Sequence, residues 1–268
     1  MGQFLLTLLE AVLIQAVVLF GLFFVLGYVL SKLQGWTQEN YFRSVGWKGI
    51  LWTAWIGTPV HELCHLLFAL LFGHRIVRVR LFAPNRETGE LGEVQHSYNP
   101  GNFYQVAGNF FIGAAPTIGG AFVLGLLAYF LLPNGKELLP TLASGSASFP
   151  SFVTGIFSVL AKIFAPQNFQ STAFWIFLYI SFCVSCHLAP SKVDRGQMWG
   201  GFVWLLLLLV AFNVVGLFFR YDPSTLVVSF ATHVSLLTAL FVYAILISAC
   251  HFLLSCLLLL VFRRREPR

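Results

Sequence analysis

Two histidines and a glutamate lie close together in an otherwise apolar stretch of the chain. His61 and His65 are four residues apart, and Glu62 follows the first histidine, in the order H-E-x-x-H. Four residues make about one helical turn, so on a helix both imidazoles lie on one face. Two neutral imidazoles at this spacing can ligate one zinc ion, and the glutamate can take a proton from a zinc-bound water. The pattern therefore predicts His61 and His65 as metal ligands and Glu62 as a general base.

The surroundings of this motif strengthen the prediction. Ionisable side chains at membrane depth are costly, and they usually face the interior of a helix bundle and carry function. Pro59 lies two residues before His61, and a proline inside a helix frees a carbonyl and can kink the helix near a site. The alternative is that these polar residues are buried for structural reasons and hydrogen-bond to neighbouring helices.

The composition is that of a membrane protein. Of the 268 residues, 58% are hydrophobic and only 10% are charged, with a mean hydropathy of +0.81, whereas about a quarter of a soluble domain is charged. We expect an all-α polytopic membrane protein with about six transmembrane helices and a small β-hairpin after the second, in one membrane-embedded domain over residues 1–268. The net charge of +6 lies mainly in loops and at the C-terminus. Membrane topology explains that charge, so no nucleic-acid partner is expected.

Long apolar segments predict where the chain crosses the lipid bilayer. The expected transmembrane helices cover residues 4–30, 50–72, 103–132, 173–188, 199–219 and the last part of 226–262. A loop is expected after residue 30, an interfacial or re-entrant helix at 152–164, and a break near His233. Most of the 16 basic residues fall in the even loops and the C-terminal tail if both termini are inside. The positive-inside rule therefore favours a cell-membrane protein with both termini cytoplasmic.

Residues 74–102 predict a cytoplasmic β-hairpin. Residues 76–82 alternate with period two, as a strand does, and 90–97 form a weaker second strand. An exposed strand edge there could pair with an extended peptide, although an ordinary surface hairpin is the alternative. We expect His74 and His96 to be surface histidines and not ligands.

A catalytic zinc site needs a third protein ligand, and Asp194 is the best candidate. Few acidic residues lie in or beside the apolar segments, and the expected topology places Asp222 in an outer loop. His187, Cys183 and Cys186 compete for the same role, since with the motif histidines they could form a closed structural site. These three residues also match C-x-x-C-H, a haem-attachment pattern, but they lie in an apolar segment where such attachment is not expected.

Other polar residues in the apolar segments have simpler interpretations. Gln15 lies deep in the first segment and needs a partner on another helix. Asn109 either orients a ligand or packs between helices, and small residues around it allow close helix approach. His233 and His251 have no acidic neighbours, so we expect packing roles for both. The five cysteines lie in apolar segments, which indicates buried thiols and not a disulfide framework.

These motifs resemble the site-2 protease family of intramembrane zinc metalloproteases. In that family an H-E-x-x-H helix is followed by a β-hairpin, a small-residue helix and a later N-x-x-P-x-x-x-x-D-G-like motif. The run His61-Glu62-Leu63-Cys64-His65 matches fully, and Asp194, after Pro190 and before Gly196, matches loosely. The resemblance covers residues 50–200 as a metalloprotease-like core. It implies Zn²⁺ held by the two histidines and Asp194, with the glutamate as catalytic base.

The chain also departs from that family pattern. His187 stands where the family has asparagine, and Arg195 separates Asp194 from Gly196. The resemblance still implies an intramembrane zinc metalloendopeptidase that cleaves membrane proteins or membrane-associated peptides through a zinc-activated water. The alternative is a zinc-binding membrane protein with a structural, transport or sensing role and no proteolysis. A di-iron hydroxylase would need a larger histidine cluster than the seven scattered histidines of this chain provide.

Overall fold

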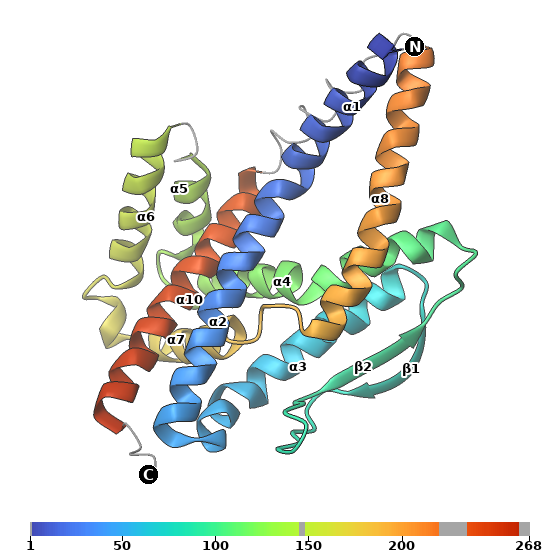
Figure 1. The fold of residues 1–268 in the computed structure, drawn as a ribbon. Coiled ribbons are helices and arrows are strands. Elements are labelled where there is room, and N and C mark those ends of the chain that lie inside the picture. Colours follow the sequence, from blue (N-terminus) through green and yellow to red (C-terminus); the bar gives the residue numbers. More distant parts are fainter. Residues whose placement is uncertain (1, 145–147, 220–234, 263–268) are drawn as a thin grey trace.

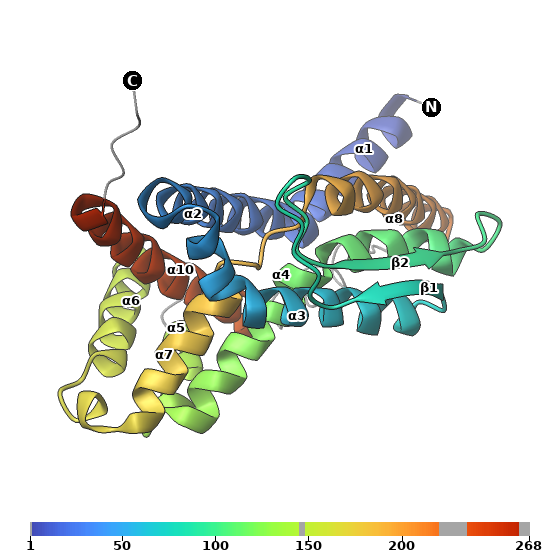
Figure 2. The same cartoon turned by 90° about the horizontal axis from the view of Figure 1, so that it is seen from below.

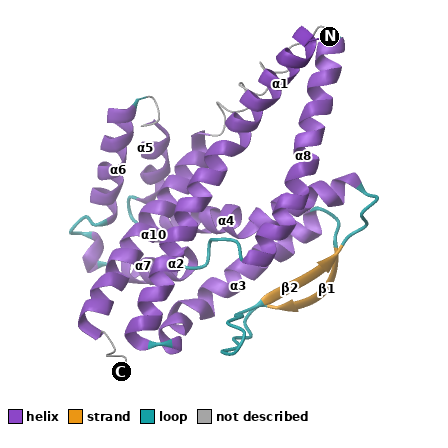
Figure 3. Cartoon of the chain, viewed as in Figure 1, coloured by secondary structure: helices purple, strands orange, loops and turns teal. Residues whose placement is uncertain are grey.

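The computed structural model describes residues 2–144, 148–219 and 235–262. Most of this is helical, and its one sheet is a two-stranded antiparallel hairpin (Figure 3). The first elements are α1 (Gly2–Ala16), η1 (Val17–Gly21), α2 (Leu22–Val45), α3 (Trp47–Leu71), β1 (Arg75–Arg80), β2 (Glu93–Ser97) and α4 (Phe103–Leu131). They are followed by η2 (Gly135–Glu137), α5 (Leu138–Ser144), α6 (Phe149–Ile163), η4 (Asn168–Gln170), α7 (Thr172–Ser185), α8 (Lys192–Phe218) and α10 (Ser235–Phe262). The expected fold class is confirmed.

The first helix is longer than expected. α1, the short π-helical turn η1 and α2 follow one another without a loop as far as Val45. The loop expected after residue 30 is therefore wrong, because residues 31–45 contain no proline to end the helix. The chain turns instead at Gly46, whose φ of 75° is a conformation that favours glycine.

Six helices in the described residues are long and apolar enough to cross a membrane. They cover Leu8–Val45, Trp47–Leu71, Phe103–Leu131, Phe149–Gln170, Lys192–Gly216 and Leu236–Phe262. The number agrees with the expectation, but the stretch expected to be interfacial or re-entrant, at 152–164, is among the six. The segment expected to span at 173–188 contains α7, whose 14 residues reach only about 21 Å, less than the bilayer core of about 30 Å.

α2 and α10 run in the same direction. Three contacts join them along their length: Phe23–Phe241, Trp36–Phe252 and Asn40–Ser255. The start of α1 and the end of α10 therefore lie at opposite ends of the molecule (Figure 1). A membrane crossed by both helices would separate those ends. The expectation of two cytoplasmic termini, which came from the positive-inside rule applied to six spans, stays a prediction.

α4 lies at the centre of the helices and packs against α3, α7, α8 and α10. The main core contains the fully buried Leu124, Phe174 and Tyr243, where α4, α7 and α10 meet. A polar contact joins α1 to α8. Gln15 is buried and exchanges two hydrogen bonds with Asn213, of 3.0 and 2.7 Å, so the expected partner on another helix is confirmed.

The hairpin follows α3 directly and lies alongside it (Figures 1 and 2). Gly73, with a φ of 70°, turns the chain out of α3 and into β1. β1 and β2 pair Arg80 with Glu93 and Ile76 with His96. The predicted strands are confirmed, and the hairpin lies over the helix that carries the histidine motif. Asp222 and the break predicted near His233 lie outside the described residues.

Candidate metal centre

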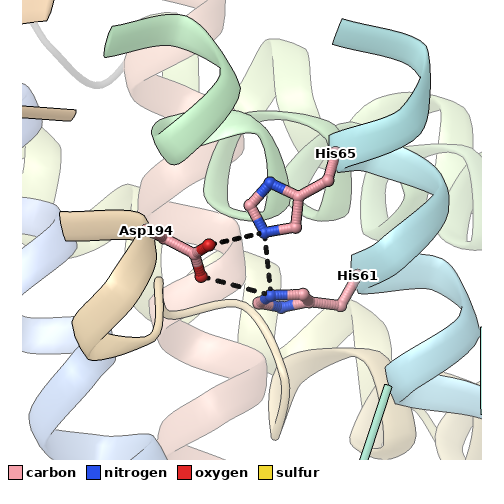
Figure 4. A group of neighbouring side chains, drawn as sticks. All are labelled: His61, His65 and Asp194. Carbon is pink, nitrogen blue, oxygen red and sulfur yellow. Dashed lines mark hydrogen bonds and ion pairs between the residues drawn. The ribbon is translucent and has the colours of Figure 1, made fainter. Parts of the chain in front are cut away.

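Three side chains from α3 and α8 converge in the way that Figure 4 shows. The Nε2 atoms of His61 and His65 are 3.1 Å apart. The Asp194 carboxylate places Oδ1 3.3 Å from Nε2 of His65 and Oδ2 3.7 Å from Nε2 of His61. Among the described residues, this group alone offers three or more histidine, cysteine or acidic ligand atoms that could hold a metal ion, all within 4.8 Å. The structure thus brings together the three ligands predicted from sequence.

Backbone carbonyls orient both imidazoles. His61 Nδ1 lies 2.7 Å from the carbonyl oxygen of His187, and His65 Nδ1 lies 2.8 Å from that of Ile112. A carbonyl only accepts hydrogen bonds, so each Nδ1 must carry the proton and donate it. In the neutral rings each Nε2 is then bare. Metal-ligating histidines commonly donate their other N–H to a carbonyl in this way, which fixes the ring and its tautomer.

The donor set fits a cation. Two bare imidazole nitrogens and a carboxylate face one point, and a positive charge between them relieves the mutual repulsion of their lone pairs. Ligands about 2.0–2.1 Å from a tetrahedral zinc lie roughly 3.3 Å from one another. The nitrogen–nitrogen and nitrogen–oxygen distances of 3.1, 3.3 and 3.7 Å bracket that value. The residues therefore fit a bound metal ion.

Asp194 is positioned by the first turn of α8. The Ser191 N–H donates to Asp194 Oδ2 at 2.7 Å, and the Asp194 N–H donates to Ser191 Oγ at 3.2 Å. This reciprocal pair is a capping box, in which each side chain satisfies a free backbone N–H. Arg195 points elsewhere, because its guanidinium donates to the Pro190 carbonyl at 2.7 Å. The S-x-x-D spacing of Ser191 and Asp194 in the sequence could have indicated this capping box.

Glycines allow the helices to approach closely enough for these contacts. A Cβ at Gly57 of α3 would lie 2.2 Å from the carbonyl oxygen of Cys183. That close packing holds the His187 carbonyl against His61. On the other side, a Cβ at Gly201 of α8 would lie 2.2 Å from the backbone nitrogen of Phe110 in α4. Small residues thus let α7 approach the motif helix α3 and let α8 approach α4, as expected for membrane helices.

Glu62 lies beside the metal ligands and beneath the hairpin. It is buried and within electrostatic reach of His61, His65 and Asp194. A Cβ at Gly92 would lie 2.9 Å from Glu62 Cγ, so the chain entering β2 passes directly against this side chain. The predicted base therefore lies between the ligand group and the hairpin.

The competing ligands lie outside the group. The His187 ring faces the Cys183 carbonyl through Nδ1 at 3.0 Å, and His187 contributes its own carbonyl to His61. Its Nε2 is buried without a hydrogen-bond partner in the described part of the chain. Cys183 and Cys186 are free buried thiols, as expected, and neither joins the metal group. Asn109 is buried and its Oδ1 has no partner among the described residues, which leaves both interpretations of it open.

Two histidine predictions have different outcomes. His251 is buried, stacks on Phe182 at 4.6 Å and bonds the Tyr41 hydroxyl at 2.8 Å, so its packing role is confirmed. His74 was expected at the surface, but it is 4% exposed, and its ring lies 2.9 Å from His96. The surface expectation for His74 is wrong, because Gly73 turns it against α4 and not toward solvent.

The fold and the site define a multi-span helical membrane protein with a His-His-Asp group that could hold a metal ion. No protein-family model matches the chain, and neither does any curated protein or any solved structure.

Proposed function

We propose that this protein is a zinc-dependent endopeptidase that cuts peptide bonds of membrane proteins or membrane-associated peptides. One observation carries the proposal: Asp194 of α8 meets His61 and His65 beside Glu62. Three protein ligands leave a fourth position of a tetrahedral zinc for water, which is the composition of a catalytic site. A carboxylate next to such a site suits the base of a hydrolase.

Zinc bound here would lower the pKa of a water and polarise the scissile carbonyl. Glu62 takes the proton from that water as its oxygen bonds to the carbonyl carbon. Glu62 then delivers the proton to the amide nitrogen as the carbon–nitrogen bond breaks, so the carboxylate is regenerated. His187 and Ile112 hold the two imidazoles through their carbonyls, and Ser191 holds the Asp194 carboxylate.

The proposed substrate is a peptide in extended form. A helical substrate must unwind first, because its backbone groups are hydrogen-bonded to one another. The hairpin supports an extended substrate, since the chain at Gly92 passes against Glu62 and β2 begins at the next residue. A two-stranded sheet has free outer edges, and an added strand can pair with such an edge.

The charge distribution supports an orientation with the N-terminus on the outer side. Arg43 and Lys48 lie at the end of α2 and the start of α3, at the end of the molecule where α10 also ends (Figure 1). The sequence after α10 adds three consecutive arginines, 263–265. By the positive-inside rule, this charge favours a cytoplasmic location for that end.

The test is zinc content and proteolysis of the detergent-purified full chain, with fluorescein-labelled casein as an unfolded probe. We expect about one zinc per chain, lost in Asp194→Ala and retained in Glu62→Gln. Glu62→Gln should lower kcat by about 10²–10⁴-fold, because it removes the base. Glu87→Gln, a change at an exposed hairpin carboxylate, is the control and should behave as wild type. Casein cleavage by Glu62→Gln at the wild-type rate would contradict this mechanism.

The second candidate is a zinc-binding membrane protein without protease activity. It rests on the same ligand group, because the orienting hydrogen bonds of Asp194 and both histidines suit a metal ion of either kind, structural or catalytic. Stoichiometric zinc that stabilises the fold, without casein cleavage, would support this candidate over the protease.

A further inference from the structure

A second pair of imidazoles lies at the end of the hairpin nearest α4. His74 follows α3 at the turn into β1, and His96 lies on β2, with their Nδ1 atoms 2.9 Å apart. His74 Nε2 lies 2.9 Å from the carbonyl oxygen of Gln105 in α4. Tyr98 stacks on the His74 ring at 5.2 Å. The ring of His74 is therefore held from three sides.

These contacts define where the protons lie in the neutral pair. The Gln105 carbonyl can only accept, so His74 Nε2 carries a proton and donates it. The Nδ1 of a neutral His74 is then bare and must accept. His96 Nδ1 is the donor across the 2.9 Å contact, which leaves the Nε2 of His96 bare. The contact with His74 thus leaves Nε2 of His96 free to accept a hydrogen bond.

His96 lies on the side of the hairpin that faces the metal group. Gln197 on α8, His65 and Asp194 all lie within electrostatic reach of His96. Gln197 lies about one helical turn after Asp194 and is exposed. With Nδ1 engaged by His74, Nε2 is the ring nitrogen available on the Gln197 side. Because Gln197 is exposed, a bound ligand can move its side chain aside.

We propose that His96 is a substrate-binding residue of the peptidase, whose Nε2 accepts a main-chain N–H of the bound peptide, and that His74 is its positioning residue. This inference rests on the proposed function and adds a contact to the same site. The peptide N–H approaches the bare Nε2 of His96 from the side of Gln197. Burial, followed by the neighbouring His74, lowers the pKa of His96 below its ordinary value, which keeps the ring neutral and able to accept.

The test measures casein cleavage by the zinc-loaded full chain and its variants. His96→Ala should raise KM about three- to tenfold with kcat unchanged, because it removes one neutral hydrogen bond made in both ground and transition states. Added imidazole should restore KM, and His96→Gln, which keeps an acceptor oxygen, should lose less. Gln95→Ala, at the neighbouring exposed position on β2, is the matched control. Zinc content should be unchanged in every variant.

A second measurement does not depend on activity. Nitrogen-15 NMR of histidine-labelled protein should find His96 protonated at Nδ1 and bare at Nε2, and His74→Phe should abolish that preference. The opposite tautomer of His96, loss of zinc from His96→Ala, or equal KM values for His96→Ala and Gln95→Ala would each overturn the inference. If wild type cleaves casein and Glu62→Gln does not, those results overturn the role of His96 alone. If wild type cleaves nothing, the peptidase proposal fails together with the role of His96.

Discussion

A Cβ atom at Gly113 of α4 would lie 2.5 Å from the main-chain oxygen of Asp194 and 2.8 Å from Cβ of Met198. The third ligand is thus delivered to the histidines by a helix crossing that has no room for a methyl group. Because the nearest atom belongs to the backbone, a side chain at this position must push the start of α8 away from α4 and so move Asp194 relative to the histidines.

We therefore predict that Gly113→Ala weakens zinc binding by about 10–100-fold, the range typical of changes that disturb ligand orientation. Competition with a zinc chelator on the purified protein measures this. Gly200→Ala on α8 is the matched control, since a Cβ there meets nothing within 4 Å. Equal zinc affinity in the two variants would contradict a requirement for close packing at Gly113.

The capping box at the start of α8 gives a second prediction. Ser191→Ala removes the acceptor of the Asp194 N–H, so unfolding should become about 1 kcal/mol easier and zinc should bind about tenfold more weakly. Ser148 caps α6 in the same way, accepting from the Ser151 N–H at 3.3 Å. Ser148→Ala should show a similar loss of stability with unchanged zinc affinity. Wild-type zinc affinity in Ser191→Ala would contradict the idea that this cap positions Asp194 for zinc binding.

The sequence allowed the ligand group to be predicted for two physical reasons. The spacing of His61 and His65 fixes their common face on any helix, and acidic residues are so scarce in apolar segments that Asp194 had few rivals. The carbonyls of His187 and Ile112 had no such signal, because every residue carries one. Which carbonyl reaches an imidazole depends on how closely the helices pack.

The direction of the helices was harder to predict than their number. Hydropathy locates long apolar segments well, but α7 is short and the segment at Phe149–Gln170 is interrupted by a turn. A difference of one crossing reverses the side on which the C-terminus lies. The burial of His74 was missed for a related reason, since it depends on Gln105 in another helix.

The hairpin histidines give a pH prediction. Burial and then His74 lower the pKa of His96, so its NMR titration in zinc-free protein should fall below the ordinary value of about 6.5. As the pH falls through this ordinary value of about 6.5, His96 binds a proton in the unfolded chain but not yet in the folded chain. The free energy of unfolding should therefore decrease as pH falls in this window. His96→Gln should make that pH dependence shallower, and an unchanged slope would assign it to other groups.

The Gln15–Asn213 pair gives a final prediction about how α1 is held against α8. Each amide is buried and donates to the other, and Asn213 also donates to the Leu209 carbonyl at 2.9 Å. Gln15→Leu should lower the free energy of unfolding in mixed micelles by about 1–3 kcal/mol, because it leaves a buried amide without its partner. Asn213→Leu should do the same. In the double variant no unpaired amide remains, so the two losses should not add, with a coupling of about 1–2 kcal/mol. Additive losses would mean that the two amides contribute independently and that other contacts hold α1 in place.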